Sequence, residues 1–143
     1  MGDIALTAAK VALCDPTKAE TFDGIAGVTI TAGQSLYRIT ASGLLGLADE
    51  DADAEHSQAV GVALTGGGAG QVVSVLRKGR CYGFTVSALA YNLPISLSAT
   101  AGALLDTGAT TNVVGRIEPL SDANLTKVIY FDFEIGTKAT VAT

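Results

Sequence analysis

The chain has 143 residues, of which 48% are hydrophobic and only 16% are charged, and its formal net charge is −5 at pH 7. This length suits one compact domain, and the acidic balance disfavours nucleic acid as a partner. No apolar run approaches the roughly 18–20 residues of a membrane span, and no signal-peptide pattern opens the chain. We therefore expect synthesis in the cytoplasm, with neither a membrane nor a nucleic acid as partner.

The first part of the chain, residues 1 to about 24, shows little periodicity and holds a mixed polar stretch around Pro16. Such a segment is either disordered or ordered against a partner. We predict an extended N-terminal arm over residues 1–27, and a chain that lacks residues 1–24 is then expected to fold.

The remainder, 28–143, is predicted to be β-rich, because short β-type runs alternate with Gly or polar clusters. The runs lie at 28–31, 35–40, 57–64, 71–77, 80–87, 94–98, 112–119 and 127–135. In the last run Ile129, Phe131 and Phe133 recur at every second position, which predicts a half-buried strand. The predicted fold class is all-β, a single small β-barrel or sandwich-like domain with the extended arm. A solvated loop or a single turn is expected at 47–56, and one short helical turn at 86–92.

The order of these runs repeats once. The segments 36–40, 41–45, 59–64 and 72–76 are followed by 93–97, 101–105, 113–117 and 127–131, which have the same order and similar patterns but few identities. We interpret them as two similar β units within one barrel or sandwich.

Two motifs resemble binding loops but fail the tests for them. The run TGGGAGQ, residues 65–71, lacks the Lys and the following helix of a phosphate loop, so we predict a connection between two strands. The acidic run 49–55 lacks the Gly and the final Glu of a calcium-binding EF-hand loop. A solvated loop is the first interpretation, with an irregular cation site or a contact to a basic partner as alternatives.

Catalytic and metal chemistry have few residues to use. His56 is the only histidine, so any His-dependent catalysis must use it. Cys14 and Cys81 lack the spacing of a redox or zinc motif, and without a secretory context we expect two reduced thiols. We predict no enzyme activity, no cofactor and no metal site; a small β-barrel enzyme or binding module that uses His56 beside the acidic run remains the alternative.

The only basic cluster is Arg77, Lys78 and Arg80, which we place on a turn closed by Gly79. A soluble turn is the first interpretation. The alternative is a contact between copies of the chain, in which these residues meet Asp49, Asp51 and Asp53 of a neighbour.

Two longer stretches, AGQSLYRITASGLLGLA (32–48) and HSQAVGVALTGGGAGQVVSVLRKGRCYGF (56–84), resemble the capsid decoration, or cement, proteins of tailed bacteriophages. The similarity covers about residues 28–84, with a weaker echo through 93–133. It includes no catalytic motif.

The resemblance implies a structural protein on the outer surface of the virion capsid. Such a protein binds the major capsid protein of the expanded shell, commonly as a homotrimer, and stabilises the shell against internal DNA pressure. The N-terminal arm would then meet the shell, and its apolar side chains are the expected contacts: Ile4, Leu6, Val11, Leu13 and Phe22. Another virion part, such as a head-fibre or tail-tube module, is the closest alternative.

Overall fold

The computed structural model describes residues 3–49, 55–106 and 113–133, and within these residues almost all regular structure is β. The all-β fold class predicted from the sequence is confirmed. The strands are β1 (Ala12–Leu13), β2 (Glu20–Ile25), β3 (Ser35–Arg38), β4 (Leu45–Leu47), β5 (Ala59–Ala63), β6 (Val72–Tyr82), β7 (Pro94–Leu97), β8 (Leu104–Leu105), β9 (Val113–Ser121) and β10 (Asn124–Asp132). Two single-turn 3-10 helices, η1 (Ala8–Lys10) and η2 (Pro16–Lys18), complete the regular elements.

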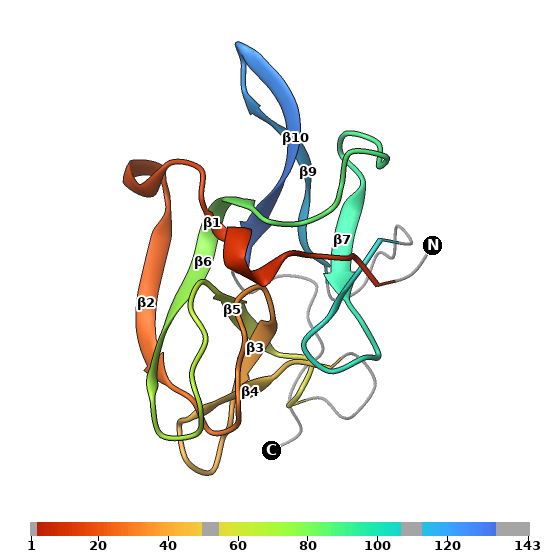
Figure 1. Cartoon of the computed structure of the whole chain (residues 1–143). Coiled ribbons are helices and arrows are strands. Elements are labelled where there is room, and N and C mark those ends of the chain that lie inside the picture. The colour runs from red at the N-terminus through yellow and green to blue at the C-terminus, as the bar shows by residue number, and fades with distance from the viewer. Residues whose placement is uncertain (1–2, 50–54, 107–112, 134–143) are drawn as a thin grey trace.

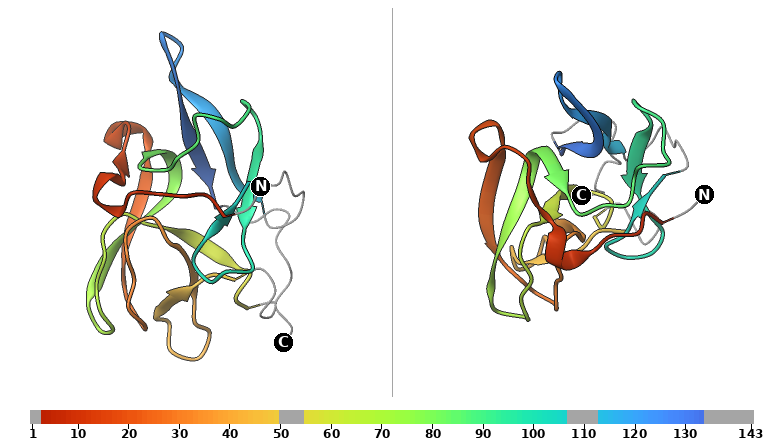
Figure 2. Two further views of the ribbon diagram at one scale, coloured as in Figure 1. Left: turned by 45° about the vertical axis from the view of Figure 1, so that its right-hand side comes forward. Right: turned by 45° about the horizontal axis from the view of Figure 1, so that its top comes forward.

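The strands form one antiparallel sheet that curls into a half-barrel, as the two views of Figure 2 show. Its order is β4-β3-β5-β6-β10-β9-β7-β8, and both β1 and β2 pair with β6. The order before β6 is mirrored after β10, so the chain consists of two four-stranded units joined through the β6–β10 pair. Figure 1 shows the β9–β10 hairpin extending beyond the rest of the molecule.

The two units share their strand registers, which supports the repeat seen in the sequence. Leu36 pairs with Gly61 in the first unit and Ile95 with Gly115 in the second, and an irregularity follows directly after both pairs. The structure also corrects the alignment between the units. Leu45 corresponds to Leu104, one residue earlier than the sequence pattern indicated, because Arg38 pairs with Leu45 as Leu97 pairs with Leu104.

Gly61 and Gly115 occupy the same place in the two units and have the same steric reason to be glycine. A Cβ on Gly61 would lie 2.7 Å from the carbonyl oxygen of Leu76 on the next strand. A Cβ on Gly115 would overlap the carbonyl oxygen of Tyr130, which is the corresponding neighbour. Close approach of two backbones therefore selects glycine at both positions.

Strand β6 is the central strand of the sheet, because β1, β2, β5 and β10 all pair with it. The prediction of a turn at 77–80 is wrong, since β6 runs without a break through these residues. The chain bends there instead: the register shifts between Glu20 and Thr21 of the partner strand, and Gly79 has φ +142°. A β-bulge within one continuous strand therefore lies where the sequence pattern predicted a chain reversal.

The apolar side chains form two buried clusters. The smaller one lies in the first unit and includes Leu36, Leu45, Val73 and Val75. The larger one joins both units. Its fully buried members include Val62 and Leu76 from the first unit and Leu97, Ile117, Ile129 and Phe131 from the second. The predicted alternation in the last strand is confirmed, because Ile129, Phe131 and Phe133 are all buried.

The N-terminal segment packs along this body. The backbone N–H of Ile4 donates to the carbonyl of Leu104 (2.8 Å), and Asp3 bridges Leu105, so the segment continues the sheet next to β8. The N–H of Thr85 then donates to Ala5 (2.8 Å), and Leu6 bridges Phe84. Residues 3–7 therefore link β8, the edge strand of the second unit, to the end of β6.

Other local predictions have mixed outcomes. The Gly-rich run 65–71 connects the antiparallel strands β5 and β6, as expected. The strand expected at 28–31 is reduced to a single bridge between Ile30 and Gly67. The helical turn expected at 86–92 is a series of turns, and residues 50–54 of the loop expected at 47–56 lie outside the described residues.

Candidate functional site

The apolar residues expected to contact a shell pack against the chain itself. Ile4 and Val11 are buried in the larger cluster, Leu6 and Leu13 pack on that cluster, and Phe22 packs on the smaller one. A partner surface does not reach Ile4 or Val11 unless the fold opens. Leu6, Leu13 and Phe22 keep part of their surface exposed.

The basic cluster spreads out because the three side chains have different surroundings on the bent strand β6. Arg80 donates to Glu118 (3.0 Å) and to the carbonyl of Pro119 (3.1 Å), so hydrogen bonds within the chain hold it. Lys78 is the register partner of Glu20 on one side and of Asp132 on the other. Arg77 lies with its guanidinium carbon 4.9 Å from the centre of the Phe22 ring. Of these three residues, Arg77 is the candidate for a contact with a partner.

Asp49, Asp51 and Asp53 are the acidic residues expected to meet this cluster. Asp51 and Asp53 lie outside the described residues. The N–H of Asp49 donates to the carbonyl of His56 (2.9 Å), which ties the two ends of the loop together. A contact between these acids and the basic cluster of a second copy stays a prediction.

His56 forms a pair with Tyr37, which lies buried in β3. The Tyr37 hydroxyl and His56 Nε2 are 3.0 Å apart, and their ring centres are 4.4 Å apart. Such a pair joins an imidazole to a phenol through both a hydrogen bond and a ring contact. The Thr40 N–H binds Glu55 Oε2 at 2.7 Å, so this carboxylate caps the backbone beside the pair.

The thiols are free and poorly activated. Burial raises the pKa of Cys14 to about 11 and that of Cys81 to about 12. The thiolate is the nucleophilic form, so both groups are nearly inert at neutral pH. Leu13 is the register partner of Cys81, which places Cys14, the next residue, on the opposite face of the sheet. This geometry does not favour a bond between the two sulfurs.

Two open depressions flank the half-exposed ring of Tyr82. One, of about 670 Å³, lies between η2 and the β9–β10 hairpin and includes Lys18 and Asp122 in its lining. The other, of about 600 Å³, lies between residues 7–12 and the chain after β6. Both are shallow and wide, and this shape suits contact with a surface or a chain segment more than enclosure of a small molecule.

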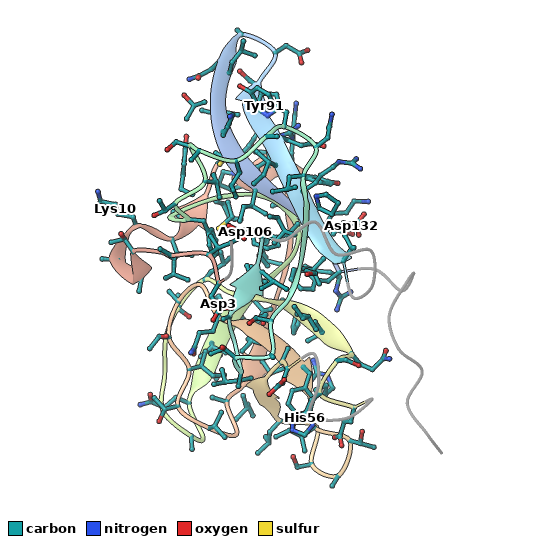
Figure 3. All side chains as sticks on the ribbon, turned by 90° about the vertical axis from the view of Figure 1, so that its right-hand side faces the viewer. Asp3, Lys10, His56, Tyr91, Asp106 and Asp132 are labelled. Carbon is teal, nitrogen blue, oxygen red and sulfur yellow. The ribbon has the colours of Figure 1, made fainter. Side chains whose placement is uncertain are left out.

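Large apolar side chains are exposed at separate places on the body. Val72 (64% exposed) and Ile25 (46%) are cross-strand partners at one end of β2 and β6. Leu125 (65%) lies in the protruding hairpin, where its carbonyl accepts a hydrogen bond from the hydroxyl of the exposed Tyr91. Figure 3 shows Tyr91 at the hairpin end of the molecule and His56 at the opposite end.

In the described part of the chain, no three His, Cys, Asp or Glu side chains gather in the manner of a metal site. None of the helices there has the length and apolar character needed to cross a membrane. No model of a known protein family matches the chain, and no curated protein shows detectable sequence similarity to it.

The sequence did not single out Arg38, Val72, Tyr82, Tyr91 or Leu125. Val72 occurs in a strand-like run whose alternation gives no sign of which end of the strand is covered, and Leu125 lies between two such runs. Arg38 is a lone charge after an apolar run. Exposure at a strand end and contact between distant strands both depend on tertiary structure, and neither leaves a local pattern.

Proposed function

We propose that this chain is a decoration protein that binds the outer surface of the expanded capsid of a tailed bacteriophage and stabilises it against the pressure of the packaged DNA. The sequence resemblance over residues 28–84 suggests this role. The observation that carries the proposal is the placement of exposed apolar side chains at separate points of a compact β body, around Val72 and Ile25 at one end and Leu125 and Tyr91 at the other.

This placement suits binding to a repeating lattice. A decoration protein gains stability from several shallow contacts made at once, and linked weak contacts give strong overall attachment without one deep site. Shallow apolar contacts also lose little side-chain entropy, because Val and Ile have few rotamers to fix. A homotrimer on a three-fold position of the shell multiplies these contacts further.

The contact residues differ from those that the resemblance alone implies. Because Ile4 and Val11 are part of the core, we assign the shell contacts to the exposed residues of the body instead. The pair Ile25–Val72 and the hairpin residue Leu125 are the leading candidates. Phe22 remains a candidate, since part of its ring is exposed.

A binding experiment with purified expanded, undecorated capsids tests the role. The wild-type chain should co-sediment with the capsids to saturation, and Leu125→Asp should weaken this binding because a carboxylate then has to be desolvated in an apolar contact. Thr126→Asp is the matched control, since it adds the same charge to the neighbouring exposed residue and removes no large apolar group. Failure of the wild-type chain to bind would contradict the proposal.

Imaging of intact particles separates the proposal from its closest alternatives. Density on the capsid faces that disappears when the gene is deleted supports a decoration protein. Density along the tail or on projecting fibres would instead indicate a tail-tube or head-fibre module. The mass of the purified chain in solution tests the homotrimer.

A further inference from the structure

The arginines of the chain divide into two pairs. Arg80 and Arg116 share one carboxylate, since both lie within 3.0 Å of an oxygen of Glu118. Arg38 and Arg77 share one aromatic ring, with guanidinium carbons 5.7 Å and 4.9 Å from the centre of Phe22. The carboxylate of Glu118 thus pairs with both members of the first pair. Among the residues that the structure describes, no carboxylate pairs with the second pair.

Three separate strands build the second pair. Phe22 of β2 is the register partner of Val75 and packs on the smaller apolar cluster. Arg77 of β6 lies next to the bulge, and Arg38 ends β3. The Arg38 side chain is held by a hydrogen bond from Nη1 to the carbonyl of Gly43 (2.7 Å). A ring and a carbonyl thus orient two cations before any partner arrives, which lowers the entropy cost of binding.

The charged groups around Arg38 and Arg77 permit an anion to bind to these two arginines. No carboxylate of the described residues forms an ion pair with Arg38 or Arg77. Asp23 lies next to Phe22 in the strand, but alternation places it on the other face, where Ser74 donates a hydrogen bond to it at 3.2 Å. Glu20 lies two residues before Phe22, on the same face by alternation, and is the register partner of Lys78.

The backbone beside Phe22 offers a second kind of contact. Strand β2 pairs with β6 along one side, and its other side meets β4 only past its end, where the Gly27 N–H donates to Leu45 (2.8 Å) and Ala26 bridges the same residue. From Glu20 to Ile25 no described strand pairs with that side. Such an edge presents N–H and C=O groups to which an extended chain can add.

We propose that this edge binds an extended acidic segment of a partner protein, which adds as a strand beside β2 and places its carboxylates on Arg38 and Arg77. The planar guanidinium groups match carboxylates in geometry, and alternate residues of an added strand all face the same side. Two arginines are too few to neutralise the backbone of a nucleic acid. The inference is independent of the proposed shell role, since it stands on the surface alone.

A labelled hexapeptide of alternating Glu and Val provides the test, with alternating Gln and Val as its neutral control. We expect the acidic peptide to bind the wild-type chain, and each of Arg38→Gln and Arg77→Gln to weaken binding about fivefold, as expected for one partly exposed ion pair. Arg116→Gln is the matched control, because Arg116 is exposed and paired with Glu118, and it should leave the affinity unchanged. Thermal melting confirms that every variant is folded.

Amide exchange decides whether a strand is added. The N–H groups of Thr21 and Asp23, which neighbour Phe22, should exchange more slowly in the complex if the peptide pairs with β2. Equal weakening by Arg116→Gln would show nonspecific attraction and overturn the proposal. Failure of inorganic phosphate to displace the peptide at constant ionic strength supports the carboxylate assignment. Saturable phosphate binding without peptide binding overturns it. Self-association of the wild-type chain that Arg77→Gln abolishes would name a second copy as the occupant and also overturn it.

Discussion

Substitution of Ile4 by Ala tests whether the N-terminal segment belongs to the core. Ile4 is 7% exposed and packs in the larger cluster. The substitution removes three carbon atoms, and at about 0.8 kcal/mol for each buried methylene the lost transfer energy is about 2.4 kcal/mol. A cavity near a chain end collapses partly, so the additional cavity cost is small. We expect the free energy of unfolding to fall by about 2–3 kcal/mol.

Urea unfolding followed by circular dichroism measures this change. With a slope of about 2 kcal/mol per molar urea, the midpoint should fall by roughly 1 M. Ala9→Ser is the control in the same segment, because Ala9 is exposed and a surface substitution costs less than about 0.5 kcal/mol. An Ile4→Ala midpoint equal to that of the control would show that residues 3–7 are a free arm and refute the reasoning.

Three further outcomes follow from the same structure. Deletion of residues 1–24 should leave the chain unable to fold cooperatively, because it removes Ile4, Val11 and most of β2; an intact sigmoidal melt would contradict this. Gly61→Ala and Gly115→Ala should each lower stability by about 1–3 kcal/mol in urea titrations, since both force a methyl group against the next strand, and markedly unequal losses would show that the two units are not equivalent. The folded pKa values of Cys14 and Cys81, about 11 and about 12, lie above the ordinary value of 9.0. The contribution of the two thiols to stability is therefore complete below pH 9 and is lost as the pH rises toward 12. The melting temperature should fall over that pH range, and it should fall less in Cys14→Ala.

The sequence predicted the strands that themselves carry strongly apolar side chains. The alternation of Ile129, Phe131 and Phe133 marked β10, and the repeated order of runs anticipated the two units. It missed β2 because Thr21 and Asp23 face solvent and Gly24 has no side chain, so the strand carries no alternating pattern. The sequence pattern indicated two strands in place of β6 because Gly79 resembles a turn residue, although Gly79 lies within the strand near the bulge and pairs with Phe131. Strand pairing with a distant partner decides both cases.

The candidate surfaces were harder to predict than the fold. Arg77 was singled out as part of a basic cluster, but its neighbours in sequence point elsewhere, and its neighbours in space, Phe22 and Arg38, come from strands far along the chain. The burial of Ile4 and Val11 depends on partners from the second half of the chain, such as Leu104. Apolar residues in a polar, aperiodic segment look the same whether they meet another protein or their own core.

The pairing of residues 3–7 with Gly83, Thr85 and Leu104 has a consequence during synthesis. A ribosome releases this segment long before it releases the strands that receive it, so the segment has to wait unpaired while most of the chain is made. Contacts between residues so distant in sequence close slowly. The larger cluster also contains Ile117, Ile129 and Phe131, so it is completed only after translation has passed β10. A chain stalled before β8 exposes Ile4 to chaperones.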